Sequence, residues 1–431
     1  MNEPLPLIAV TKRNAARVAA KVRGRSRDVS EVEKIVEEIV AKVRLEGDKA
    51  LLMYSRTLDR AEIGGALRVS GDDLTEAAQT IDAKLSEALR FSLGRIRRTQ
   101  GQLLRRLSYT YVANGFVTRS APRPISSVGC YIPGGRASYA STVLMTAGVA
   151  KLAGVKRVVL CTPPDPQGRV SGAVLAAAQI CGVDEVYRVG GAHSIAALGY
   201  GTETIPKVDK IVGPGGIYVS VAKRLISRDV PIDFFAGPTE LVVVGDETAD
   251  PRLVAWDLVG QAEHGEDSLC GFVTWDEGLA RKVRREAALL ARGAQRESYV
   301  RGALDRGFTA LCSDREAALA LVNAVAPEHL EVMVKDARSF SEGIENAGLV
   351  LLGKYAPCAA SDYCIGTDHV IPTQGYAALR GGLSVFDFLK LSWTTEGTKE
   401  GLKATLPSLE ALAKSEGLPN HYESAAARFK R

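Results

Sequence analysis

Residues 127–161 read SVGCYIPGGRASYASTVLMTAGVAKLAGVKRVVLC, and this stretch decides the fold. A short apolar segment at 127–132 ends in the loop Pro133-Gly134-Gly135. A helical pattern follows over 141–153, and a second apolar segment covers 157–161. Two strands joined by a helix are parallel neighbours in one sheet. The stretch therefore predicts a βαβ unit with a glycine loop at the end of its first strand.

The same alternation continues along most of the chain. Further strands are expected at 185–189, 210–212, 232–235, 241–244, 271–275, 308–312, 330–334 and 349–352, with helices at 172–181, 194–198, 217–226, 251–261, 279–292, 317–324 and 340–346. This alternation of strands and helices predicts the α/β class: two Rossmann-like doubly wound units with small helical N- and C-terminal extensions. Because ligands of such sheets sit beyond the carboxyl ends of the strands, we expect the functional site there.

The expected division of the chain has four parts. Residues 1–27 form an N-terminal arm, and residues 28–125 join 240–382 in a first, discontinuous α/β domain. Residues 126–239 form the second Rossmann-like domain, and 383–431 form a small helical C-terminal domain. Helical patterns at 30–43 and 74–107 fill most of the first hundred residues. The Gly-, Pro- and Thr-rich stretch 353–382 is expected to be irregular and functional.

Composition excludes several classes of protein. The 431 residues are 46% hydrophobic and 24% charged, which is typical of a globular chain. A net charge of +5 is too small to predict nucleic-acid binding. The longest apolar stretch, 142–161, is broken by three basic residues, so no membrane span is expected. Seven cysteines without a C-x-x-C pair indicate reduced thiols in a cytoplasmic protein.

Three glycine loops end successive expected strands: Pro133-Gly134-Gly135, Gly190-Gly191 and Gly213-Pro214-Gly215-Gly216. Glycine lets backbone N–H groups approach a phosphate at a helix N-terminus, where the helix dipole favours anions. None of the loops is a G-x-G-x-x-G followed by an acid at the right distance, and each alone is more typical of a tight turn. Together they favour a nucleotide or phosphate crevice.

Candidate metal ligands and bases are spread over distant segments. Gln261 and His264, three residues apart, share one face at a helix end. Asp362, Cys364 and His421 could join them in a mixed site for Zn²⁺ or another divalent ion, although such histidines are more often structural. The adjacent Glu328 and His329 could act as paired bases. Exposed Glu-His pairs are, however, usually inactive.

Several long strings resemble the histidinol dehydrogenase family, over about residues 28–428. They are VGCYIPGGRA (128–137), STVLM (141–145), PKVDKI (206–211), AGPTE (236–240), QAEHG (261–265), PEHL (327–330), GTDHVIPT (366–373) and LSVFDFLK (383–390). The resemblance implies a zinc-dependent enzyme of the last step of histidine biosynthesis. It would oxidise L-histidinol through L-histidinal to L-histidine, a four-electron reaction that reduces two NAD.

The resemblance also implies roles for individual residues. The family's zinc ligands fall on Gln261, His264, Asp362 and His421, and its two acid–base residues fall on Glu328 and His329. Substrate contacts carry over to Thr239 and Glu416, besides the zinc ligands and His329. The family is a homodimer in which the C-terminal domain, with Glu416 and His421, completes the partner's site.

The chain departs from the family at the expected cofactor contacts. These fall on Tyr131, His193 and Gly216, and the family usually has Gln and Asn at the last two positions. Losing an amide at Gly216 predicts weaker NAD binding. A histidine at 193 predicts that NAD affinity rises as the pH falls. Acceptance of NADP stays open, because the sequence shows no acid at the position that normally excludes a 2′-phosphate.

Two other functions are compatible with the residues. A paralogous zinc- and NAD-dependent dehydrogenase could act on another polar alcohol, such as a sulfonated diol, but a pocket built for imidazole would reject it. Comparing turnover of histidinol and of a diol separates these two enzymes. A non-enzymatic, zinc-stabilised or nucleic-acid-binding protein would instead reduce no NAD and would lose nucleic-acid affinity steeply with salt.

Overall fold

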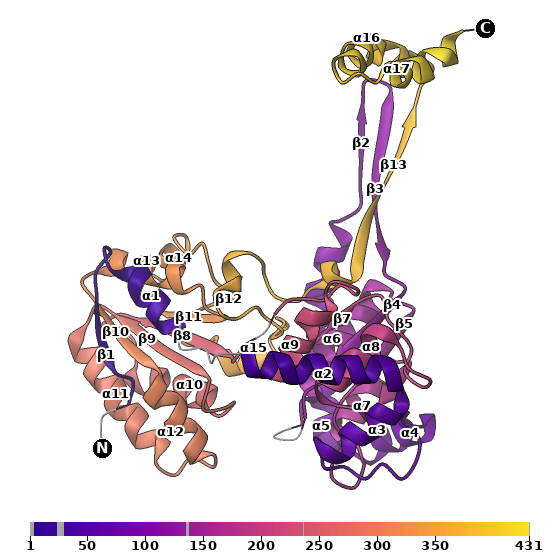
Figure 1. The fold of residues 1–431 in the computed structure, drawn as a ribbon. Coiled ribbons are helices and arrows are strands. Elements are labelled where there is room, and N and C mark those ends of the chain that lie inside the picture. Colours follow the sequence, from indigo (N-terminus) through magenta and orange to yellow (C-terminus); the bar gives the residue numbers. More distant parts are fainter. Residues whose placement is uncertain (1–3, 24–29, 135–137, 236, 431) are drawn as a thin grey trace.

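The computed structural model describes residues 4–23, 30–134, 138–235 and 237–430. Two α/β units lie side by side, and an arm projects from the second unit with the C-terminal helices at its tip (Figure 1). The α/β class with parallel sheets is therefore confirmed. None of the helices in the described part of the chain combines the length and apolar character needed to cross a membrane.

The first unit is built on a six-stranded parallel sheet in the order β1-β10-β9-β8-β11-β12. Its strands are β1 (Leu7–Val10), β8 (Glu240–Gly245), β9 (Leu269–Thr274), β10 (Phe308–Cys312), β11 (His329–Met333) and β12 (Leu349–Leu352). Its helices are α1 (Ala15–Arg23), α10 (Pro251–Ala262), α11 (Glu277–Ala291), α12 (Glu297–Arg306), α13 (Arg315–Val325), α14 (Ala337–Ser341) and α15 (Cys358–Tyr363). A doubly wound arrangement follows from the alternation of strand side chains. Leu241 and Val243 pack under α10, α11 and α12, whereas Val242 and Val244 pack under α1 and α13.

The second unit has a four-stranded parallel sheet in the order β6-β5-β4-β7. Its strands are β4 (Ser127–Tyr131), β5 (Arg157–Cys161), β6 (Glu185–Tyr187) and β7 (Ile211–Val212). Helices α6 (Ala140–Ala153), α7 (Gly172–Cys181), α8 (Gly191–Tyr200) and α9 (Ile217–Ile226) connect or follow these strands. The expected strand at 232–235 is wrong, since Ile232 makes a single bridge to Ile211.

The packing corrects the expected division of the chain at two points. Residues 7–10 of the expected N-terminal arm are β1, an edge strand of the six-stranded sheet. The helices α2 (Ser30–Glu46), α3 (Asp48–Thr57), α4 (Gly71–Thr80) and α5 (Ala83–Arg105) cover the four-stranded sheet and not the six-stranded one. The helical run expected at 74–107 is split between α4 and α5. An apolar helix face predicts burial, but it does not indicate against which sheet.

The projecting arm is a three-stranded antiparallel sheet that the sequence analysis did not anticipate. It has the order β13-β3-β2 and consists of β2 (Tyr109–Ala113), β3 (Phe116–Pro124) and β13 (Leu389–Gly397). Helices α16 (Lys399–Ser415) and α17 (Pro419–Ala426) follow it, and three short 3₁₀ turns lie at Tyr376–Ala378, Val385–Phe388 and Ala427–Phe429. The C-terminal part is therefore strand and helix: residues 383–388 pack in the core of the second unit, whereas α16 and α17 stand away from both α/β units (Figure 1).

Candidate active site

The expected acid–base pair lies at the amino ends of two central strands. His329 is the first residue of β11 with Glu328 just before it, and Thr239 precedes Glu240, the first residue of β8. For the six-stranded sheet, these candidate residues therefore lie at the edge opposite to the carboxyl ends expected from the sequence. Helices α10 and α13 end on the side where these strands begin, so this site faces helix C-termini.

A chain of hydrogen bonds fixes Glu328. Its Oε2 accepts from the Thr239 hydroxyl and from the backbone N–H of Glu240, both at 2.7 Å. The Gln261 amide donates in turn to the Thr239 hydroxyl at 2.7 Å. The side chain of Glu240 accepts the backbone N–H of Glu328 at 3.2 Å and that of Gln374 at 2.8 Å. Glu240, which the sequence analysis missed, thus joins β8, β11 and the 373–376 turn.

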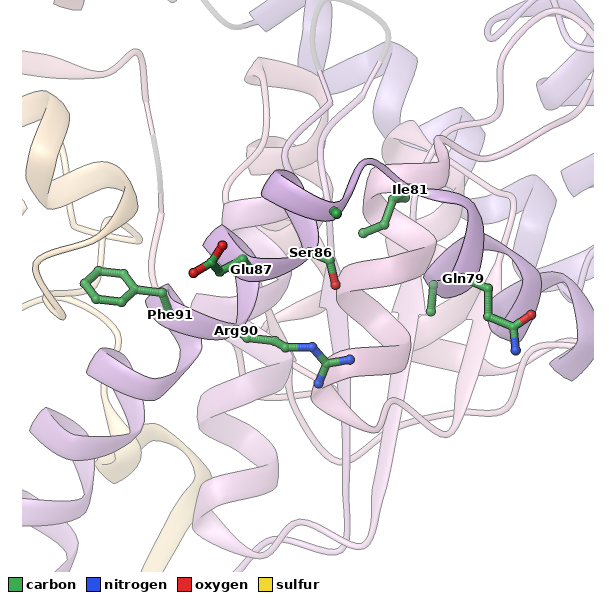
Figure 2. A pocket seen from close by; sticks show the side chains of 8 residues that line it. Gln79, Ile81, Ser86, Glu87, Arg90 and Phe91 are labelled. Carbon is green, nitrogen blue, oxygen red and sulfur yellow. The ribbon is translucent and has the colours of Figure 1, made fainter.

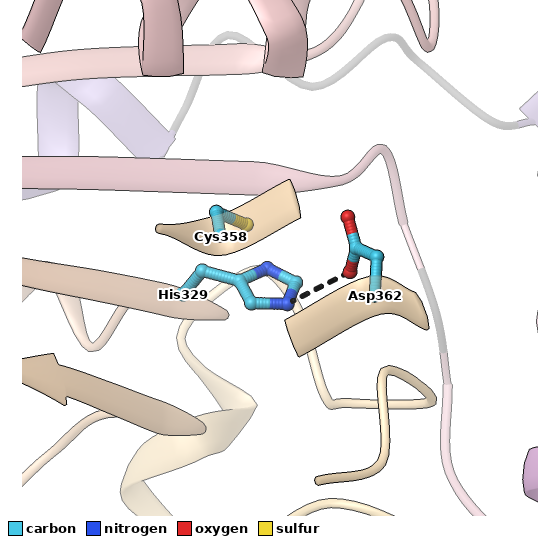
Figure 3. A group of neighbouring side chains, drawn as sticks. All are labelled: His329, Cys358 and Asp362. Carbon is cyan, nitrogen blue, oxygen red and sulfur yellow. Dashed lines mark ion pairs between the residues drawn. The ribbon is translucent and has the colours of Figure 1, made fainter. Parts of the chain in front are cut away.

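His329 is buried with one ring nitrogen engaged and the other free. Its Nδ1 lies 3.2 Å from the carbonyl oxygen of Glu240 and 3.7 Å from Glu328 Oε2. Its Nε2 has no hydrogen-bond partner among the described residues and points toward Asp362 Oδ1, 3.7 Å away (Figure 3). A ring that donates from Nδ1 to a carbonyl keeps an Nε2 lone pair directed into the site.

Charge around His329 sets its protonation. Burial by itself lowers the pKa of His329, but interactions with the neighbouring Cys358 and Glu328 side chains outweigh burial, and the pKa stands well above its usual value. Burial also raises the pKa of the Cys358 thiol to about 11.

Three of the four expected zinc ligands belong to the six-stranded unit. Gln261 is buried at the end of α10, Asp362 is partly buried on α15, and His264 follows α10 with an exposed side chain. His329, Cys358 and Asp362 offer ligand atoms within 4.8 Å of one another. Cys358, which the sequence analysis also missed, precedes Asp362 by one helical turn and donates weakly to Gln261 Oε1 at 3.8 Å. Cys364, considered earlier as a ligand, is partly exposed.

The remaining expected site residues of the C-terminal part are elsewhere. Glu416 follows α16, His421 lies in α17, and both side chains are exposed. These helices stand at the tip of the arm, away from α15 and β11 (Figure 1). The structure of one chain thus does not bring Glu416 or His421 to the other candidate residues.

The glycine loops lie at the carboxyl ends of the four-stranded sheet, as expected. The buried Tyr131 ends β4, and its hydroxyl accepts the backbone N–H of Gly191 at 3.3 Å. Gly190 and Gly216 are the N-caps of α8 and α9 and provide no side chain to satisfy the first N–H groups. Gly216 is exposed, and a side chain there would meet open space.

His193 occupies a different environment from the one expected. Its ring is fully buried, 3.3 Å from Asp59 Oδ2 and 5.7 Å from the Tyr54 ring centroid. Direct contact with a cofactor would require one of these neighbours to move. Asp59, on the loop after α3, is an acid beside the glycine loops that the sequence did not place there.

A surface hollow of about 690 Å³ lies between α4 and α5 (Figure 2). Its lining includes Gln79, Glu87, Arg90 and Phe91, and it contains none of the candidate site residues. This hollow therefore does not compete with the buried polar cluster of β8, β11, α10 and α15 as the site of chemistry.

A buried carboxylate–imidazole pair lies beside possible metal ligands in one unit, and glycine loops without side-chain caps begin two helices of the other unit. These features are typical of an α/β enzyme that binds its ligands with both units. Comparison with known proteins is more specific. The sequence profile of the family described as histidinol dehydrogenase matches residues 22–429, and the chain belongs to this family. The resemblance inferred from the sequence is thereby confirmed, and the chain is an oxidoreductase of the type used in histidine biosynthesis.

Individual relatives agree over nearly the whole chain. The histidinol dehydrogenase of Methanothermobacter thermautotrophicus is 41% identical over 98% of this chain and 100% of its own length. That of Methanopyrus kandleri is 43% identical over 93% of this chain and 95% of its own length. The crystal structure of histidinol dehydrogenase from Elizabethkingia anophelis is 33% identical, covers 100% of this chain and 99% of its own, and superposes with a TM-score of 0.94.

Proposed function

We propose that this protein oxidises L-histidinol through L-histidinal to L-histidine, with one NAD reduced in each of two steps. The observation that carries the proposal is the buried pair of Glu328 and His329, with a free Nε2 facing Asp362. A four-electron oxidation needs one group to remove protons from the alcohol and from the hydrated aldehyde, and another to activate water. The two side chains are adjacent, so they can serve the same carbon atom.

His329 is the residue proposed to remove protons from the substrate. Its Nε2 accepts the hydroxyl proton of the alcohol in the first step and that of the aldehyde hydrate in the second. The pKa of His329 is raised, so the imidazole must lose its proton before it can act as a base. A cation bound beside Asp362 would lower that pKa again, because a second positive charge disfavours the imidazolium.

Glu328 is the residue proposed to activate the water that hydrates the aldehyde. Hydrogen bonds from Thr239 and Glu240 hold Oε2, so Oε1 is the oxygen that remains to accept a proton from water. The Gln261–Thr239–Glu328 chain connects this base to a proposed metal ligand. A shift of Gln261 would therefore move Glu328 as well.

A divalent cation is proposed to be bound by Gln261, His264 and Asp362, of which Asp362 offers a ligand atom within 4.8 Å of His329 and Cys358. Amide oxygen, imidazole and carboxylate are ligands that Zn²⁺ accepts, and the C-terminal ends of α10 and α13 favour positive charge. Cys358 and His329 offer further ligand atoms beside Asp362. When bound, the metal would orient the imidazole and amine of the substrate. NAD would supply the hydride acceptor from the glycine-loop side.

The site is proposed to be completed by a second copy of the chain, which brings Glu416 and His421. Two features support this. The arm carries both residues away from β11 and α15 (Figure 1), and the strand registers place apolar side chains of β2 and β13 on one face of its sheet. Tyr109, Tyr111, Leu391 and Trp393 on the arm are 49% to 63% exposed, and Tyr109 and Trp393 touch edge to face at 5.5 Å. An isolated three-stranded sheet of this kind gains stability by packing against a partner.

The direct test is a stoichiometric assay with L-histidinol and NAD. The proposal requires two NADH per histidinol consumed, and one NADH with release of histidinal would overturn it. Glu328→Gln should impair the oxidation of histidinal about 10²-fold or more, because water is no longer activated. His329→Asn should impair both steps, and full activity of either variant would remove the role assigned to that residue.

Subunit exchange tests the shared site. His421→Ala and Glu328→Ala are each expected to be inactive alone. Mixed after subunit exchange, they should regain activity, because each hybrid has one site free of both changes. No recovery after verified exchange would contradict a site shared between two chains.

A further inference from the structure

A buried ion pair lies next to the last glycine loop of the four-stranded unit. Lys223 on α9 and Asp233 on the segment after α9 are in direct contact, and their side chains are 1% and 0% exposed. Taking two charges out of water costs free energy that their mutual attraction offsets only when further hydrogen bonds satisfy both groups. The other contacts of these two side chains therefore show what the pair holds in place.

Those contacts converge on Gly213, the first residue of the loop. Asp233 Oδ2 accepts the backbone N–H of Gly213 at 2.8 Å, and Lys223 Nζ donates to the carbonyl oxygen of Gly213 at 2.9 Å. Gly213 directly follows β7 and is buried, whereas Gly216, three residues further on, is the exposed N-cap of α9. The two members of one ion pair thus bind both backbone polar groups of the residue at which the loop leaves the sheet.

The conformation of Gly213 is one that other residues rarely adopt. Its φ is +117°, and a Cβ at this position would lie 2.2 Å from the carbonyl oxygen of Tyr131 at the end of β4. Glycine gains access to this conformation only at the cost of greater freedom in the unbound loop. Charge-assisted hydrogen bonds to the N–H and to the C=O of the same residue select one conformation and remove that freedom.

Asp233 is itself held by the chain around it. Its backbone N–H donates to the carbonyl oxygen of Ile211 at 3.1 Å, and its own carbonyl oxygen accepts a hydrogen bond from Arg380. Its Oδ1, which contacts Lys223, also accepts the backbone N–H of Phe234 at 2.6 Å. Both carboxylate oxygens therefore have donors, and the side chain cannot turn away from Gly213 without losing them.

We propose that Lys223 and Asp233 are positioning residues that hold the 213–216 loop in the shape that receives the phosphates of NAD. Both side chains are buried, so they act through Gly213 and do not touch the cofactor. Their contribution is preorganisation, because a loop that is ordered before binding does not have to be ordered by the cofactor. This inference rests on the proposed function, since it takes the glycine loops as the NAD side of the protein.

The first test is Lys223→Met, which keeps an unbranched side chain of similar length and removes the ammonium group. NAD affinity in calorimetric titration should fall about tenfold or more, because the Gly213 carbonyl loses its donor and the loop must be ordered on binding. The KM for NAD should rise with it. The KM for L-histidinol and the Zn²⁺ affinity should stay within about twofold of wild type, since both ligands are expected at the other sheet.

The double variant Lys223→Met/Asp233→Asn separates positioning from stability. Lys223→Met alone leaves a buried carboxylate without its cation and should lower the melting temperature. The double variant has no unpaired charge at this place, so most of the thermal stability should return. Methionine still cannot donate to Gly213, and the loss of NAD affinity should therefore persist. If Lys223→Met does not fold, the double variant carries the affinity test by itself.

Lys210→Met is the matched control, with the same substitution at the other end of β7. Lys210 pairs with Asp387 at 3.2 Å, and the two side chains are 15% and 9% exposed. Arg380 remains as a partner of Asp387 at 2.9 Å. Because Gly213 keeps both of its hydrogen bonds in this variant, NAD affinity should stay within about twofold of wild type.

Two results would overturn the positioning role. One is wild-type NAD affinity in Lys223→Met, and the other is an affinity that recovers together with stability in the double variant. Hydrogen exchange of the wild-type protein adds a readout that needs no variant. The Gly213 amide should exchange as slowly as the amides of β4, because it is buried and bonded to a carboxylate, and rapid exchange would contradict the proposal. If this amide is protected but wild type binds no NAD, the proposed function fails and the pair orders the loop for structure alone.

Discussion

The two parallel sheets place their candidate sites at opposite edges. In the four-stranded sheet, the glycine loops follow the carboxyl ends of the strands and start α8 and α9. In the six-stranded sheet, Glu328 and His329 lie at the amino end of β11, near the last turns of α10 and α13. Helix N-termini attract anions and helix C-termini attract cations. One edge therefore suits the phosphates of a dinucleotide, and the other suits a metal ion and an imidazolium.

Helix caps make the carboxyl edge of the six-stranded sheet a poor site for phosphate. There, α10, α11 and α13 begin with Asp250, Asp276 and Asp314, each of which accepts a backbone N–H of the first turn. These caps satisfy the free N–H groups and add negative charge, so a phosphate is disfavoured. The N-caps Gly190 and Gly216 provide no side-chain cap to α8 and α9, and the Tyr131 hydroxyl accepts only the Gly191 N–H of α8.

Metal removal should produce the largest difference between the two sheet edges. Treatment with a chelator should abolish turnover, and added Zn²⁺ should restore it, because the metal orients the substrate. NAD affinity of the metal-free protein should stay within about twofold of its original value, since the dinucleotide is expected at the other sheet. Calorimetric titration with NAD, with and without metal, checks this. Loss of NAD binding on chelation would contradict the placement of NAD at one edge and of the metal at the other.

Gly213→Ala should damage the four-stranded edge alone. Gly213 has a φ of +117°, and a Cβ there would lie 2.2 Å from the carbonyl oxygen of Tyr131. Relief of this clash must move the loop, so NAD affinity should fall about tenfold or more while Zn²⁺ affinity is retained. Gly172→Ala, in an open position on α7, is the matched control and should leave both affinities unchanged.

The pH dependence of stability probes the amino edge of the six-stranded sheet. Burial raises the pKa of Glu240 to about 8, above its value in the unfolded chain. The folded state then retains a proton that the unfolded state loses. The stabilisation from this group is complete below about pH 4. It declines by about 1.4 kcal/mol per pH unit as the pH rises from there to 8, and it is lost above pH 8. Urea denaturation of Glu240→Gln between pH 5 and 8 should show a shallower decline than wild type, and equal slopes would refute this.

The smallest effect is expected at His193. Because its ring is buried against Asp59 and Tyr54, His193→Gln should change NAD affinity by no more than about threefold, with the same pH dependence as wild type. The sequence-based expectation is the opposite, with wild-type affinity rising as the pH falls and the variant showing no such rise. Titrations of both proteins with NAD at several pH values decide between the two.

Sequence reasoning located most elements of the fold and many residues of the candidate site. The βαβ stretch at 127–161 appears as β4, α6 and β5 nearly at the expected bounds, because strong apolar periodicity is a local property. The strands that pair with distant parts of the chain were harder to predict. The edge strand β1 is apolar but only four residues long, and the arm strands β2 and β13 are largely exposed and lack the pattern of a buried strand.

The sequence by itself determined the family, the α/β class and the identity of the candidate catalytic residues, since each is carried by contiguous strings or local periodicity. Only the tertiary structure decided which sheet each helix covers and at which edge the bases lie. It alone brought Cys358 and Asp362 beside His329 and buried His193 beside Asp59. Such contacts join residues that lie far apart in the chain, more than a hundred positions in the case of Asp59 and His193. They arise because apolar faces and buried polar groups must find partners in space, and no local pattern names those partners.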